Sequence, residues 1–268
     1  FSAVTLSQFQ SVSAALGKDT FSSVTPLHLR KFFGASIAQF LTEILFVYQT
    51  PARPISNHVE SSTVSFPHTK ADLPLEHTAV EFNVFAFFDN EEVGSGTKQG
   101  AASTLLSDVL WRINKALGKD EEDFYRAVAG SFMLSCDNAH AVHPNYQQKT
   151  DVNNCNYMNE GIVIKSHAGQ KYTSDAVSIA IFKAICEKAG VPVQFFANRS
   201  DAAGGSTLGN IAMAQVSMNT VDIGLPQLAM HSAYETSGVK DTGYLIEASK
   251  EFYSCHIKAA GDGLFEIA

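Results

Sequence analysis

Residues 81–96, "EFNVFAFFDNEEVGSG", contain a continuous apolar run that ends at two adjacent glutamates and a glycine loop. The run at 81–88 is typical of a buried strand, because it is short, apolar and rich in aromatic residues. It is followed by "TKQGAASTLLSDVLWRINKAL" (97–117), whose apolar residues recur at helical spacing. A buried strand, a polar loop and a helix in this order form the repeating unit of an α/β fold.

The same alternation continues to the end of the chain. Further strands are predicted at 131–136, 161–166, 191–198 and 217–226, and further helices at 122–130, 174–190 and 241–255. Gly190 ends the second of these helices as a C-cap. The sequence therefore predicts an α/β layered sheet with helices on both faces.

The first 80 residues differ from the rest. They are rich in serine, threonine and proline, and only 27–49 has a long periodic apolar pattern, which predicts a helix. We therefore divide the chain into an amino-terminal segment, 1–80, that is poorly patterned as a domain, and a main domain, 81–268.

Length, composition and charge exclude several classes of protein. With 268 residues and 45% hydrophobic content, the chain can bury a sizeable core and is not expected to be disordered. A net charge of -8 without basic runs argues against nucleic acid and against an anionic membrane surface as partners. The most apolar early stretch, 38–48, is too short to cross a bilayer. We expect no membrane-spanning segment.

Cysteine usage and the amino terminus bear on the compartment. Four widely spaced cysteines without a CxxC pair predict neither a disulfide framework nor a thiolate zinc site, and fit a reducing, cytoplasmic compartment. No basic region followed by an apolar one is present at the amino terminus, so we expect no signal peptide. The first residue is Phe1, and we expect the chain to begin inside a longer gene product.

Acidic and histidine residues stand where the predicted strands end. They are Asp89, Glu91, Glu92, Asp137, His140, His143, Asp201 and His231. Ligands of layered α/β sheets bind beyond the carboxyl ends of strands, and carboxylates mixed with imidazoles suit zinc, manganese or cobalt. Two such metals together can bind a hydroxide and polarise a carbonyl. One of the adjacent glutamates can then coordinate a metal, which relieves their repulsion, while the other acts as general base.

Each of these features also has an ordinary structural interpretation. Adjacent glutamates after a strand are common in solvated turns and at helix N-termini. His140 and His143 are also compatible with hydrogen-bonded histidines near a proline turn. The "GGST" stretch at 204–207 is equally typical of a loop that ends in a helix N-cap.

Longer motifs point to one family. "FFDNEEVGSGTKQGA", "SFMLSCDNAHAVHPNY", "GIVIK", "QKYTSDAVS", "RSDAAGGSTLGNI" and "VDIGLPQLAMHSAYET" resemble, in order and spacing, the aspartyl aminopeptidase family of metallopeptidases, specifically its bacterial cytoplasmic members. The resemblance covers about residues 81–257. It implies a zinc-dependent exopeptidase-like fold and an enzyme that removes N-terminal residues, Asp or Glu above all, from peptides.

The resemblance also implies roles for single residues. Glu91 matches the general base, and Glu92, Asp137 and His231 match metal ligands. His140 matches a histidine that binds substrate and stabilises the tetrahedral intermediate. Lys165 matches a lysine that receives the acidic side chain of the substrate, although a surface lysine is the alternative from the residue alone. Asp201, Gly204 and Gly205 are expected near the substrate.

The chain departs from the family before residue 80. An early histidine should complete one metal's shell, and His28 in "PLHLRKF" is a weak candidate. An aspartate that bridges both metals should lie a little under forty positions before Glu92, where Pro54 or Ile55 stands. The family's inserted dimerisation and lid domain has no room between 28 and 80. The resemblance nevertheless implies two zinc ions, with manganese or cobalt as alternatives, and a dodecameric homo-oligomer.

Two hypotheses follow for the function. The first is a zinc aminopeptidase in which metal and Glu91 activate the attacking water. The alternative is a catalytically incomplete fragment or family member that serves as a structural or assembly subunit, as the missing bridging aspartate suggests. The retained Glu91 favours the enzyme, because a merely structural protein has no physical need for a general base.

Overall fold

The structure is a computed structural model that describes residues 43–49, 81–88, 91–261 and 263–268. For 43–49, 81–82, 87, 92 and 93 it describes the backbone alone. His28 and the position at Pro54 or Ile55 lie outside the described residues, as does most of the 1–80 segment. Within the described part, no helix is both long and apolar enough to cross a membrane.

From β2 onward, the longer strands and helices alternate as the sequence predicts, and several short elements that it does not predict lie between them. The strands are β1 (Glu43–Gln49), β2 (Glu81–Phe87), β3 (Phe132–Cys136), β4 (Ala139–His140), β5 (Ile162–Ser166), β6 (Val193–Ala197), β7 (Asn219–Gly224), β8 (Pro226–Leu228), β9 (Thr236–Ser237), β10 (Ile257–Gly261) and β11 (Leu264–Ile267). The helices are α3 (Glu91–Gly94), α4 (Leu105–Ala116), α5 (Glu121–Gly130), the short 3₁₀ helix η3 (Gln147–Lys149), α6 (Ala176–Ala189), α7 (Leu208–Ala212) and α8 (Val239–Ser254).

The central sheet has the strand order β2-β1-β3-β7-β5-β6. Strand β1 is antiparallel to both β2 and β3, and β3 is parallel to β7, so β2, β3 and β7 run in the same direction. Glu43 is opposite both Phe87 and Cys136, and Cys136 is opposite Ile223. The last residues of β2, β3 and β7 therefore lie at one edge of the sheet.

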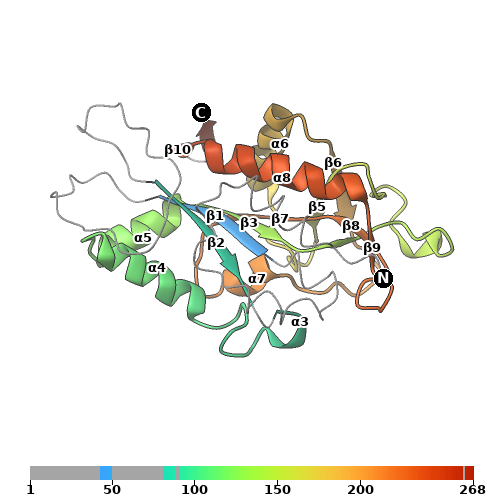
Figure 1. Cartoon of the computed structure of the whole chain (residues 1–268), viewed down its shortest axis with the longest axis horizontal. Helices are drawn as coiled ribbons and strands as arrows, with labels where there is room; N and C mark the ends of the chain where they lie inside the picture. The colour runs from blue at the N-terminus through green and yellow to red at the C-terminus, as the bar shows by residue number, and fades with distance from the viewer. Residues whose placement is uncertain (1–42, 50–80, 89–90, 262) are drawn as a thin grey trace.

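Helices cover the sheet on both faces (Figure 1). Buried apolar residues of β3, β5 and β7 pack with α6 and α8 in one core cluster. Met133 joins Leu110, Leu208 and other apolar residues of α4, α5 and α7 in a second cluster. Because successive strand residues point to opposite faces, these two clusters lie on opposite sides of the sheet. The predicted α/β layered sheet with helices on both faces is confirmed.

The helix predicted for 27–49 is wrong over the part that the structure describes. Residues Glu43–Gln49, "EILFVYQ", form β1, and both edges of this strand are occupied, by β2 and by β3. A continuous apolar run fits a buried helix and a buried strand equally well, so periodicity alone could not separate them. The β-branched and aromatic residues of this run favour the strand. Residues 27–42 lie outside the described part.

Helix α4 begins at Leu105 rather than at 97, where the sequence predicts it. Residues 94–103 instead form consecutive turns, in which Thr97 N donates to Gly94 O at 3.0 Å and Gly100 N donates to Thr97 O at 3.1 Å. Gly100 lies so close to the Ser95 carbonyl that a Cβ would overlap it. The glycines in this stretch thus form a compact loop between β2 and α4.

Alanine substitutions at two glycines are expected to change the free energy of unfolding in opposite directions. Gly190 ends α6 with φ 68° and ψ 26°, and Gly243 lies inside α8; a Cβ would meet no atom within 4 Å at either position. Gly190→Ala is expected to destabilise the protein by about 1 kcal/mol, because alanine is strained in the left-handed conformation. Gly243→Ala is expected to stabilise it by about 0.5–1 kcal/mol through helix propensity. Denaturant unfolding of both variants measures the two changes in the free energy of unfolding. Changes of the same sign would contradict the prediction.

Candidate active site

The candidate site lies at the sheet edge where β2, β3 and β7 end. Glu91 and Glu92 open α3 just after β2, Asp137 directly follows β3, and His140 is the last residue of β4. At Gly224, the last residue of β7, a Cβ would overlap the Asp137 carbonyl oxygen, so glycine allows β7 to approach the Asp137 backbone. The strand directions therefore bring Glu91, Glu92 and Asp137 to one edge of the central sheet, and His140 follows three residues after Asp137, in β4 of a separate three-stranded sheet.

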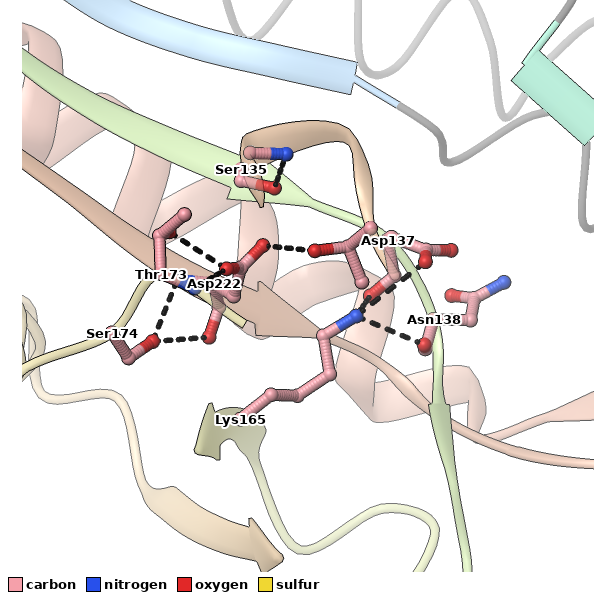
Figure 2. Close-up of polar contacts among 9 residues, drawn as sticks. Ser135, Asp137, Asn138, Lys165, Thr173, Ser174 and Asp222 are labelled. Atoms are coloured by element: carbon pink, nitrogen blue, oxygen red, sulfur yellow. Dashed lines mark hydrogen bonds and ion pairs between the residues drawn. The ribbon is translucent and has the colours of Figure 1, made fainter. Parts of the chain in front are cut away.

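Lys165 is buried beside Asp137. It is only 1% exposed, and its Nζ lies 3.5 Å from Asp137 Oδ2. The same ammonium donates to the carbonyls of Asp137 and Asn138, at 3.3 Å each, and lies 5.2 Å from the centre of the Tyr172 ring. Figure 2 shows the lysine reaching across to the chain that leaves β3. The alternative of an ordinary surface lysine is therefore wrong.

His140 and His231 lie within electrostatic reach of this pair. Loss of hydration is the main cause of a lowered pKa at His140; the positive charges of His231 and Lys165 lower it further, and the Asp137 carboxylate opposes them. His231 has the left-handed backbone φ of 64°, and its backbone N–H donates to Glu235 Oε1 at 2.7 Å. A positive φ is uncommon for a residue other than glycine. The turn after β8 thus places His231 near His140.

The described side chains do not form a complete zinc site. In the part of the chain whose side chains are placed, no three His, Cys, Asp or Glu groups converge closely enough to hold a metal ion. A zinc site requires at least three protein ligands. Of the predicted ligands, Asp137 and His231 are described, whereas the Glu92 side chain and His28 are not. The described residues thus supply part of a ligand set, and the rest of it falls outside them.

Glu91 is half-buried at the start of α3. Its carbonyl accepts a hydrogen bond from Ser95 Oγ at 3.3 Å, which ties the short helix to the glycine loop behind it. Glu91 is thus neither a surface group nor fully enclosed.

Several other predicted residues have contacts of their own. Asp201 is exposed and paired with Arg199, whose Nη2 and Nε lie 2.6 and 2.9 Å from its two oxygens; these bonds lower the pKa of Asp201. His143 accepts a hydrogen bond from Asn145 N at 3.2 Å, as expected for the turn alternative. A Cβ on Gly204 would lie 2.6 Å from His167 Nε2, whereas Gly205 faces open space.

Asp222 is a buried acid close to the candidate site that the sequence interpretation missed. It lies in the middle of β7, is 0% exposed, and accepts hydrogen bonds from Thr173 and Thr207. The signal was present in "NTVDIGL", where an aspartate interrupts an apolar strand. Aspartate is almost never fully buried unless it is paired, so this interruption predicts a specific set of partners.

Comparisons with known proteins identify the family of this chain. The family model "Aminopeptidase I zinc metalloprotease (M18)" matches residues 57–253. A probable M18 family aminopeptidase 2 of Clostridium acetobutylicum is 54% identical over 172 residues, which cover 64% of this chain and 40% of the relative. A probable aspartyl aminopeptidase of Ricinus communis is 42% identical over 185 residues, which cover 69% of this chain and 38% of the relative.

Solved structures show the same relationship. The structure of the Ape4 and Nbr1 complex matches with a TM-score of 0.60 and 42% identity, over 62% of this chain and 31% of that chain. The mApe1 dodecamer of S. cerevisiae matches with a TM-score of 0.58 and 29% identity, over 68% and 40%. The chain thus spans less than half the length of these relatives. Since the family model matches well over half of its residues, the chain belongs to the M18 family of aminopeptidase I zinc metalloproteases.

Proposed function

We propose that this chain carries the main part of the catalytic domain of a zinc aminopeptidase that removes N-terminal residues, chiefly Asp and Glu, from peptides. One observation carries the proposal. Strands β2, β3 and β7 run in the same direction and end at one sheet edge, where Glu91, Asp137 and His140 follow, in a chain that belongs to the M18 family. The proposed domain is 81–268, and the amino-terminal segment adds strand β1 to its central sheet, between β2 and β3.

The metal would be held by residues on this edge together with ligands from elsewhere. Glu92, Asp137 and His231 are the proposed ligands, with His28 as a weak further candidate. Bound zinc, two ions by the family resemblance, or manganese or cobalt in its place, supplies a Lewis acid that polarises the scissile carbonyl. Losing a ligand weakens such a site severely, so the missing part of the ligand set is essential.

The chain's own groups carry the proton transfers. Glu91 takes a proton from the attacking water and returns it to the leaving amine. His140, whose lowered pKa keeps it neutral near pH 7, still has one N–H with which to donate a hydrogen bond to the developing oxyanion. Asp201, Gly204 and Gly205 are proposed to lie beside the substrate.

The preference for acidic residues rests on Lys165. A substrate carboxylate would meet an ammonium that is desolvated and already oriented, where a charge-assisted contact is strong. It would have to compete with Asp137 Oδ2 and with two backbone carbonyls. The name of the 42% identical aspartyl aminopeptidase supports the same preference.

Assembly and compartment are proposed from the relatives. One matched structure is a dodecamer by its title, and we propose that this protein also forms a homo-oligomer acting on peptides in the cytoplasm. The net charge of -8 supports neither nucleic acid nor a membrane surface as a further partner.

Metal content and peptide hydrolysis test the proposal together. The purified chain is analysed for bound metal, and hydrolysis of chromogenic Asp and Leu amides is measured before and after zinc, manganese or cobalt is added. Two metals per chain with turnover are expected. One metal or none, without turnover under any addition, would overturn the enzyme and favour the alternative of a structural or assembly subunit.

A further inference from the structure

The Asp222 carboxylate is fully buried and is held by three donors from two different loops. Its Oδ2 accepts from Thr173 N at 2.5 Å and from Thr173 Oγ1 at 2.7 Å, and its Oδ1 accepts from Thr207 Oγ1 at 2.6 Å. The Asp222 N–H donates to Ser174 Oγ at 2.8 Å. Figure 2 shows Thr173 and Ser174 gathered on one side of the aspartate. A buried charge is costly unless it is fully hydrogen-bonded, so these bonds define where both loops must lie.

The first loop leads to Lys165. Thr173 directly follows Tyr172, whose ring lies 5.2 Å from the Lys165 ammonium. Burial is the main cause that raises the pKa of Tyr172 to about 12, and the negative charges of Asp137 and Asp222 raise it further. Fixing Thr173 therefore also fixes the ring against which Lys165 packs.

The second loop is the glycine stretch 204–207. Thr207 is its last residue and the N-cap position of α7. Two residues further on, Gly209 N donates to Ser135 Oγ at 2.8 Å, and a Cβ on Gly209 would lie 3.0 Å from Asp222 Oδ1. The start of α7 thus packs closely against the sheet at Asp222. This contact fixes the position of the glycine loop, which directly precedes α7.

Both loops lie on the face of the sheet that carries the candidate site. The neighbours of Asp222 in β7, Val221 and Ile223, pack in the α6 and α8 cluster, so Asp222 points to the other face. Ile164 likewise packs in that cluster, and Lys165 points away from it. Asp222 therefore connects two parts of the proposed site. One is the loop that carries Tyr172, against which Lys165 packs, and the other is the glycine loop 204–207 that is proposed to flank the substrate.

We infer that Asp222 is a positioning residue of the active site, which sets the distance between Lys165 with its supporting ring and the 204–207 loop. It touches neither substrate nor metal in this role and acts through Thr173 and Thr207. The inference rests on the proposed function for the identity of the substrate. The anchoring of the two loops by Asp222 is independent of the proposed function.

A buried acid on the opposite face offers a matched control. Asp241, in the first turn of α8, is also 0% exposed and accepts from Asn159 N at 2.7 Å and from Gly161 N at 3.2 Å. Asp222→Asn and Asp241→Asn each place an amide donor where backbone or hydroxyl donors already point. Both variants are therefore expected to lose stability, and only the first should disturb the site.

Kinetics on the metal-loaded full chain test the role. Asp222→Asn is expected to raise KM for the Asp amide and to lower kcat/KM about tenfold, while Asp241→Asn keeps the wild-type KM. Thr207→Val removes the donated hydroxyl at equal size and should move KM in the same direction, and Thr207→Ser, which keeps the hydroxyl, should restore it. An equal change of KM in both aspartate variants, or no difference between Val and Ser at 207, would overturn the inference.

Amide hydrogen exchange tests the anchoring without any need for turnover. Asp222→Asn should speed exchange in 172–174 and 204–209 and leave 159–161 as in the wild type, whereas Asp241→Asn should give the reverse pattern. A wild-type chain without activity would refute the proposed function alone, and this pattern would still decide whether Asp222 holds both loops. Uniformly faster exchange in both variants would show that Asp222 only stabilises the core.

Discussion

Replacing Glu91 with glutamine is expected to lower kcat by roughly 10²–10⁴-fold, the contribution that a positioned general base makes to proton transfer. Glutamine keeps the size of the side chain but cannot accept the proton of the attacking water. Bound metal is expected to stay at the wild-type amount, because the proposed ligand is the neighbouring Glu92. Initial rates on Asp and Leu amides, with elemental analysis of the same samples, measure both quantities.

A surface glutamate provides the control for this experiment. Glu122 lies in the first turn of α5, and its mostly exposed side chain pairs with Arg126 at 3.0 Å. Glu122→Gln removes the same charge and should change neither kcat nor metal content. If Glu91→Gln loses its metal while Glu92→Gln keeps it, the assignment of base and ligand to these two residues is reversed.

The second large effect concerns Lys165. Lys165→Met removes the ammonium while nearly filling its volume, and is expected to lower kcat/KM for the Asp amide roughly tenfold to hundredfold more than for the Leu amide, as loss of a hydrogen bond between charged groups does. The variant will also lose stability, because the Asp137 and Asn138 carbonyls lose their donor. The ratio of the two activities is the proper measurement, since it does not depend on the folded fraction.

An exposed lysine separates net charge from position. Lys183, in α6, lies at the surface with its Nζ 5.6 Å from the Phe195 ring. Lys183→Met is expected to leave the activity ratio unchanged. Equal losses on Asp and Leu amides in Lys165→Met would remove the specificity role and leave Lys165 as a residue that only orients Asp137.

Local sequence rules predicted the elements whose signals lie within a few residues. Helix α6 is an example: Asp175 and Ser178 form a capping box at its start, and Gly190 ends it in the left-handed conformation. The same holds for β3 and β5, which are short apolar runs bounded by polar residues or glycine. Such signals act between neighbours in the chain, and they are therefore readable without knowledge of the fold.

The candidate site was predicted only as a set of residue types at strand ends. The sequence placed Glu91, Asp137 and His140 after strands, and the register of β2, β1 and β3 brought those ends to one edge. Whether the side chains meet depends on contacts between residues far apart in sequence, such as Lys165 with Asp137. This contact spans 28 residues and is decided by how β5 packs beside the chain leaving β3.

By itself the sequence determined the alternation of strands and helices, the two covered faces of the sheet and the family to which the chain belongs. Contacts between distant parts of the chain were needed to show that 43–49 is a strand, that Lys165 is buried rather than exposed, and that Asp222 is bonded to two loops. The physical reason is the same in each case. An apolar run, a lysine and an aspartate each have several favourable environments, and pairing with distant strands, desolvation and hydrogen bonding to residues up to 49 positions away select among them.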